Sequence, residues 1–165
     1  MNIQIEKADY WNEKHRADIP MLLDAYAHDP MGGGNPLKET VKANLVSELA
    51  KRPYAFSVIA YVDGEAAGLA NCFEGFSTFA CKPLVNIHDI AVLPEYRGLG
   101  ISQKLLEKVE EIATEKGCCK ITLEVLGNNA VAQGAYRKFG FAAYELDPEA
   151  GSAQFWEKKL GTAHI

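Results

Sequence analysis

The stretch Asn86-Ile-His-Asp-Ile-Ala-Val-Leu-Pro-Glu-Tyr-Arg-Gly-Leu-Gly-Ile-Ser102 changes character at Pro94 and decides the fold. Before the proline it has the residues of a buried strand, and after Gly100 the apolar residues recur at helical spacing. A strand therefore enters a glycine-rich turn that begins a helix. The free N–H groups and dipole of a helix N-terminus suit a phosphate or pyrophosphate. Short glycine motifs also occur in ordinary strand-to-helix connections, which leaves that alternative open.

The composition is that of one globular domain. With 165 residues, 48% of them hydrophobic, we expect residues 1–165 to form a single domain. The net charge of −5 argues against nucleic acid or an anionic membrane as a partner and favours a cationic small molecule over an anionic one. The absence of a long apolar run or a leader pattern predicts a soluble, cytoplasmic protein.

The four cysteines are Cys72, Cys81, Cys118 and Cys119. They lack Cys-x-x-Cys spacing, and the histidines are not clustered. We therefore expect no metal site, and we expect reduced, mostly buried thiols.

Hydrophobic periodicity and turn residues predict an α/β fold in the order β-α-α-β-β-β-α-β-α-β-β. The sheet should be mixed, with about seven strands and four helices, antiparallel in its first half and with a parallel crossover later. Strands are expected at residues 2–6, 54–62, 65–73, 85–93, 120–125, 141–146 and 154–160. Helices are expected at residues 11–28, with a kink or late start near Pro20, and at 37–51, 102–116 and 128–138. Residues 29–36, with three consecutive glycines, should form a mobile loop.

Two motifs resemble those of the GNAT superfamily of N-acetyltransferases. Glu95-Tyr96-Arg97-Gly98-Leu99-Gly100 resembles the family's acyl-coenzyme A motif Gln/Arg-x-x-Gly-x-Gly/Ala, with Glu95 as the one departure. The pattern Val125-x-x-x-Asn129-x-x-Ala132-x-x-x-Tyr136-x-Lys138-x-Gly140-Phe141 resembles the family's fifth strand and fourth helix. The resemblance implies acetyl-coenzyme A as acyl donor, with its pyrophosphate held by Arg97, Gly98, Leu99, Gly100, Ile101 and Ser102.

The resemblance also implies roles around the thioester. A β-bulge in the fourth strand would free the N–H groups of Ile90, Ala91 and Val92 for the oxyanion and the pantetheine. Tyr136 would donate a proton to the departing thiolate, although a tyrosine in an amphipathic helix can be purely a core residue. Asn129 would hydrogen-bond the coenzyme, or it would simply cap a helix.

His88 is the candidate general base. Histidine ordinarily titrates near pH ~6.5, so a neutral imidazole can accept the amine's proton at pH 7. His88 precedes Val92 by four residues, so strand alternation places both on one face and Asp89 on the other. The alternative is a histidine satisfied by its neighbours at the edge of the sheet, and the base could also act through one water.

Candidate acceptor residues come from two regions. The stretch Asn71–Phe79 resembles the aromatic segment of diamine and polyamine acetyltransferases, in which Phe76 and Phe79 would form a wall and Glu74 would pair with an ammonium. Aromatic residues between strands are equally often core residues. Tyr26 and His28, with Asp29, precede the glycine loop and are further candidates.

These features predict an N-acetyltransferase that moves an acetyl group from acetyl-coenzyme A to a primary amine of a small molecule by direct attack in a ternary complex. A cysteine-linked intermediate is disfavoured because the cysteines lie away from the strand-to-helix turn. The alternatives are an acetyltransferase for a protein lysine or N-terminus, and a non-catalytic acyl-coenzyme A sensor. The sequence does not decide between a monomer and a homodimer.

Overall fold

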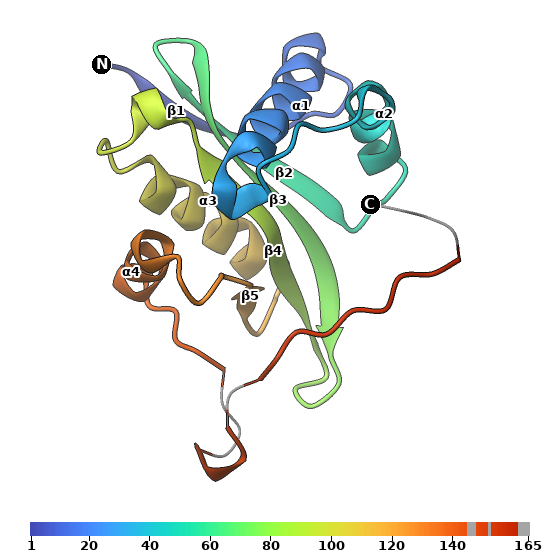
Figure 1. The fold of residues 1–165 in the computed structure, drawn as a ribbon, viewed down its shortest axis with the longest axis vertical. Coiled ribbons are helices and arrows are strands. Elements are labelled where there is room, and N and C mark those ends of the chain that lie inside the picture. The colour runs from blue at the N-terminus through green and yellow to red at the C-terminus, as the bar shows by residue number, and fades with distance from the viewer. Residues whose placement is uncertain (145–147, 152, 162–165) are drawn as a thin grey trace.

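The computed structural model describes residues 1–144, 148–151 and 153–161, and one five-stranded sheet lies at its centre (Figure 1). The strands lie side by side in chain order: β1 (Ile3–Lys7), β2 (Ala55–Val62), β3 (Glu65–Ser77), β4 (Lys82–Val92) and β5 (Ile121–Leu123). The first four pair antiparallel, and β5 lies parallel to β4. The predicted mixed sheet with a late parallel crossover is therefore confirmed.

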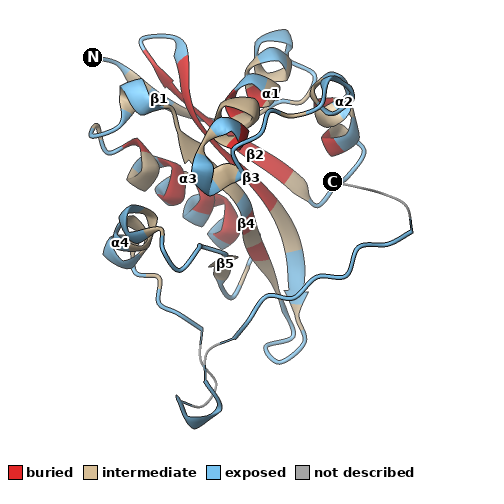
Figure 2. Ribbon diagram, viewed as in Figure 1, coloured by how far each residue is buried: buried red, intermediate tan, exposed pale blue. Residues whose placement is uncertain are grey.

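The four predicted helices are α1 (Glu13–His28), α2 (Glu39–Ala50), α3 (Ile101–Glu115) and α4 (Ala130–Phe139). Helices α1 and α2 bury Ile19, Leu22, Val46 and Leu49 against one face of the sheet. Helix α3 buries Leu105, Leu106 and Val109 against the other face. Because both faces are covered, β2 and residues 66–72 of β3 are nearly continuous buried runs, which appear red in Figure 2.

Pro20 does not end α1, which continues from Glu13 to His28. The loop after it is more ordered than three glycines suggested, because Pro30–Gly32 forms a 3₁₀ turn capped by the Asp29 side chain. No helix in the described ranges is long and apolar enough to cross a membrane. Two of the four cysteines, Cys81 and Cys119, are exposed, so the expectation of mostly buried thiols is wrong for them.

A β-bulge bends β4 at His88. Asn71 on β3 pairs with Asp89 and the next residue, Cys72, pairs with Ile87, so His88 is the extra residue of the ladder. The resemblance placed this bulge at residues 90–92, but those residues pair regularly with Gly68–Ala70. Beyond the bulge β4 runs on to Val92, whereas its ladder with β5 covers only residues 85–87. The described strands therefore leave the far part of β4 open on the β5 side.

The two last predicted strands are not confirmed, and the described sheet has five strands rather than about seven. Residues 141–144 and 153–160 are not in strands, while residues 145–147 lie outside the described part. The alternation of polar and apolar residues in these segments shows only that they are compatible with a strand conformation. A strand also needs a partner, and the described ladders of β5 involve β4 alone.

Candidate active site

The turn between β4 and α3 requires its glycines for conformational reasons. Gly98 and Gly100 have φ angles of 84° and 76°, in the left-handed region that disfavours other residues. A Cβ added to either glycine would meet no described atom within 4 Å, so the space above the turn is open. Gly100 is the N-cap of α3, and its own lack of a side chain leaves the first N–H groups of the helix accessible.

A cavity of about 480 Å³ joins this turn to the open part of β4. Most of the predicted coenzyme residues line it, namely Ile90, Ala91, Val92, Arg97, Gly98, Gly100, Ile101, Ser102 and Asn129, and so does Tyr136, the predicted proton donor. Tyr26, predicted on the acceptor side, also lines it. Residues far apart in the sequence thus form one continuous wall around a space of the size usual for small-molecule sites.

Sequence reasoning missed several lining residues, namely Met31, Tyr96, Val131, Ala132 and Ala135. The α4 residues had a usable signal, because Ala132 lies one helical turn before Tyr136 and so shares its face. Met31 had none, since its position depends on the 3₁₀ turn that follows α1. Of the predicted coenzyme residues, Leu99 lies elsewhere, packed against the core beneath α3.

Tyr136 is held inside the cavity wall by its packing. Its ring makes an edge contact with Phe141 at a centroid distance of 6.0 Å. Burial raises the pKa of Tyr136 to about 12, with a smaller contribution from the nearby Tyr26 phenol. The hydroxyl therefore stays protonated at neutral pH and can act as a hydrogen-bond donor.

Asn129 serves as the N-cap of α4, where its side-chain oxygen accepts the Ala132 N–H at 3.2 Å. This is the cap that the sequence offered as the alternative to a coenzyme contact. The cap uses only the amide oxygen, so the NH₂ group at the cavity wall is still a donor by its chemistry.

His88 lies on the α1/α2 face of the sheet, exposed, with its ring 5.6 Å from that of Phe73. The bulge turns Asp89 to this face too, where its carboxylate accepts a hydrogen bond from buried Asn71. Val92, by contrast, packs on the α3 side. The expectation that His88 shares a face with Val92, opposite Asp89, is therefore wrong, because the extra residue breaks the two-residue period.

The remaining acceptor candidates are dispersed. Glu74 pairs with Lys116 at the end of α3, with a distance of 3.5 Å between Oε1 and Nζ. Phe76 and Phe79 are exposed at the far end of the β3–β4 hairpin, at the opposite end of β4 from the glycine turn. His28 is exposed and its Nδ1 lies 2.8 Å from the Asp24 carbonyl oxygen. The structure does not gather these four residues around the cavity.

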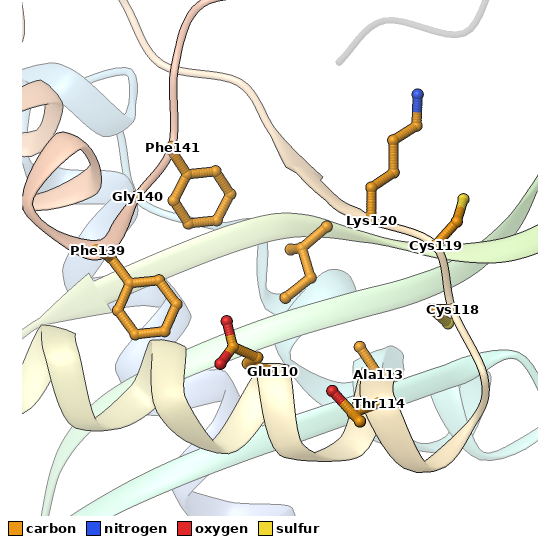
Figure 3. A pocket seen from close by; sticks show the side chains of 10 residues that line it. Glu110, Ala113, Thr114, Cys118, Cys119, Lys120, Phe139, Gly140 and Phe141 are labelled. Atoms are coloured by element: carbon orange, nitrogen blue, oxygen red, sulfur yellow. The ribbon is translucent and has the colours of Figure 1, made fainter.

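A separate cavity of about 320 Å³ lies between α3, the start of β5 and the end of α4 (Figure 3). Glu110, Thr114, Lys120, Phe139 and Phe141 are among its lining residues. Its lining and that of the 480 Å³ cavity have no described residue in common. Within the described ranges there is also no group of three or more His, Cys, Asp or Glu residues that could hold a metal ion.

The open strand β4, the glycine turn and the phenol on α4 thus line one cavity beside the sheet. Residues 19–141 match the model of the acetyltransferase (GNAT) family, and the chain belongs to this family.

Individual relatives differ in what their names state. Over 99 residues the chain is 33% identical to a putative [ribosomal protein bS18]-alanine N-acetyltransferase of Bacillus subtilis, a match that covers 60% of this chain and 62% of that protein. It is 40% identical over 85 residues to streptothricin acetyltransferase of Streptomyces lavendulae, which covers 52% and 43%. A bovine thialysine N-epsilon-acetyltransferase is 45% identical over 56 residues, which covers 34% and 33%. These matches thus span less than two thirds of each relative's length.

Solved structures share the fold at low identity. An AAC(6')-Iy structure in complex with a bisubstrate analog has a TM-score of 0.74 at 22% identity, covering 97% of this chain and 100% of that one. A ribosomal-protein-alanine N-acetyltransferase from Brucella melitensis has a TM-score of 0.73 at 16% identity, covering 96% and 100%. These likenesses establish the fold of the chain.

Proposed function

We propose that this chain is an acetyl-coenzyme A-dependent N-acetyltransferase that acetylates a primary amine of a small molecule by direct attack in a ternary complex. The observation that carries the proposal is the 480 Å³ cavity, which combines an open strand edge, an anion-binding turn and a protonated phenol. Family membership supports the same chemistry.

The residues of the cavity fit a coenzyme in kind. The N–H groups at the start of α3, and the Arg97 guanidinium, suit a pyrophosphate, for which the open space above Gly98 and Gly100 leaves room. The open edge of β4 at Ile90–Val92 can pair with an amide-bearing chain and stabilise an oxyanion. When bound, acetyl-coenzyme A supplies an activated thioester carbonyl.

The chain's own residues must then manage protons. An alkylammonium ordinarily titrates near pH ~10.4, so the acceptor must lose a proton before it can attack. We assign this step to His88. Its exposed ring lies on the α1/α2 face outside the described cavity wall, so His88 would accept the proton through water. Tyr136 donates a hydrogen bond toward the sulfur that leaves.

The acceptor side of the cavity favours an amine. Tyr26 lies near Asp29 and Asp89, whose charges add to burial in raising the pKa of its phenol. This negative potential attracts an ammonium group. The names of relatives that act on streptothricin, thialysine and aminoglycosides support a small-molecule acceptor. A protein N-terminus is the second candidate, since other relatives are named for ribosomal-protein alanine.

The test is acetyl-coenzyme A-dependent thiol release across a fixed panel: thialysine, an aminoglycoside, streptothricin and a peptide with an N-terminal alanine. We expect release with at least one small amine and none without an amine. Turnover of the peptide alone would overturn the small-molecule assignment. If the protein binds the coenzyme tightly but none of these amines causes thiol release, a sensor would be favoured over an enzyme.

A further inference from the structure

Arg97 and Asp29 form an ion pair across the wall between two cavities. Nη2 of Arg97 lies 3.5 Å from Oδ2 of Asp29, and Nε of Arg97 donates to the Val92 carbonyl oxygen at 3.3 Å. A second cavity, of about 190 Å³, shares Tyr26, Asp29, Ala91, Val92 and Arg97 with the 480 Å³ cavity. The ion pair therefore stands where the coenzyme side meets the α1 side.

The Asp29 carboxylate has one structural oxygen and one that faces a cation. Oδ1 caps the 3₁₀ turn by accepting the Met31 N–H at 2.9 Å, and Oδ2 faces Arg97. The turn is fixed against α1, because any Cβ at Gly32 would clash with the Tyr26 carbonyl oxygen. Oδ2 of this partly exposed carboxylate is therefore held in a fixed position beside the cavity, where it attracts a cation.

The smaller cavity suits an alkyl chain that leads to this carboxylate. Apart from Tyr26, Asp29 and Arg97, its lining residues are apolar: Leu22, Ala25, Ala91, Val92, Leu93 and Pro94. An alkylammonium matches such a lining, since its stem would contact the apolar residues while its charge meets Oδ2.

We propose that Asp29 binds an ammonium group of the acceptor and that Arg97 occupies this position until a pyrophosphate draws it to the glycine turn. This inference rests on the proposed function and names a residue that determines its specificity. A pyrophosphate can take the guanidinium because the existing pair is weak: its side chains are 58% and 31% exposed. The freed carboxylate then accepts the next available cation.

The chemistry also indicates which ammonium binds there. A carboxylate partner favours the charged form of an amine, and the nucleophile must be neutral. The ammonium at Asp29 is therefore a second amino group, separate from the one that is acetylated. The acceptor class is a small molecule with at least two amino groups.

The decisive measurement for the Arg97 half is a double-mutant cycle on coenzyme A affinity by calorimetry. Asp29→Asn keeps an oxygen for the Met31 cap but removes the charge, so we expect affinity to rise about twofold to fivefold. Arg97→Gln should lower coenzyme A affinity about tenfold. In the Arg97→Gln background, Asp29→Asn should raise the affinity by less than half of the gain that it gives in the parent. Glu95→Gln is the control, because it removes a charge two residues from Arg97. It should change coenzyme A affinity by the same factor in the parent and in Arg97→Gln.

The Asp29 half is tested with n-butylammonium as probe, titrated by NMR in the presence of coenzyme A. We expect binding to the parent to be at least about fivefold tighter than to Asp29→Asn, and tighter with coenzyme A than without it. Failure of the probe to bind the parent, equal binding to both proteins, or an additive cycle would overturn the inference. A parent that does not bind coenzyme A at all would instead refute the proposed function.

Discussion

Tyr136 is suited to donate a hydrogen bond rather than to give up its proton. Burial raises the pKa of Tyr136 to about 12, whereas a thiol ordinarily titrates near pH ~8.5. Complete transfer to a thiolate would leave a phenolate of much higher proton affinity in a half-buried position. A hydrogen bond to the leaving sulfur avoids this cost, and solvent can supply the proton afterwards.

Replacing Tyr136 with Phe should therefore lower kcat about 10-fold to 100-fold and change coenzyme A affinity less than about twofold. The ring contact with Phe141 survives in the variant, so the fold should too. Steady-state kinetics and calorimetry measure the two effects. Tyr96→Phe, at another tyrosine of the same cavity wall, is the matched control and should retain the parental kcat. Equal kcat in Tyr136→Phe and the parent would refute the role.

The role of His88 needs a separate test, because this residue does not line the cavity. If it accepts the amine's proton through water, His88→Gln should keep coenzyme A affinity and lose on the order of 10²-fold in kcat. The parental rate should rise with pH on the acid side of the profile, because a base accepts a proton only when it is neutral, and the variant should lack that rise. A folded, coenzyme-binding variant with the parental pH profile would make His88 structural. Thermal melting beside the kinetics controls for damage to the bulge.

At the scale of elements, the site depends on where the pairing between β4 and β5 ends. The bulge at His88 twists the strand, and the β5 ladder covers only residues 85–87, so the rest of β4 forms the cavity wall. Helix α4 forms the opposite wall through Ala132, Ala135 and Tyr136. The stability of this short helix therefore bears on the shape of the site.

Gly134 is a weak point of α4. It lies in the middle of the helix, and an added Cβ would meet no described atom within 4 Å. Gly134→Ala should therefore raise the free energy of unfolding by about 0.5–1 kcal/mol, through a less flexible unfolded chain and better helix propensity. Urea unfolding measures this change. Ala135→Gly, in the same helix, should destabilise by a similar amount. A Gly134→Ala variant that is no more stable than the parent would contradict the open surroundings that the structure shows.

The elements were more predictable from sequence than the site. All four helices follow from apolar periodicity, and the ends of α3 and α4 also follow from Gly117 and Gly140, because those signals are local. The face of His88 was not predictable, since a bulge depends on the register with the neighbouring strand. The dispersal of Glu74 and Phe79 was missed for a related reason: the sequence shows that they precede β4 but not how far the hairpin extends beyond the site.

At the scale of the whole molecule, the tyrosines limit stability in alkali. Burial is the first cause of the raised pKa of Tyr10, Tyr26, Tyr61 and Tyr136 in the folded protein. Unfolded tyrosines release their protons near pH ~10, so above that pH the unfolded state binds fewer protons than the folded state. The free energy of unfolding should therefore be constant with respect to these groups below about pH 9 and fall as pH rises from 10 to 12.

Urea unfolding at a series of alkaline pH values checks this slope. Tyr61 donates a hydrogen bond to Asp18 at 2.8 Å, so a Tyr61→Phe variant should show a shallower fall than the parent. The exposed Tyr144 provides the control, because Tyr144→Phe should leave the slope unchanged. Stability that rises between pH 10 and 12 would contradict the assignment.

The central claim is that the cavity between β4, the glycine turn and α4 binds the coenzyme, and calorimetry of coenzyme A with Gly100→Val tests it most directly. A valine side chain would enter the open space above the turn and strain the left-handed backbone of that residue. We expect the parent to bind coenzyme A and the folded variant to bind at least about 100-fold more weakly. Unchanged affinity in a Gly100→Val protein with a normal melting transition would contradict the account.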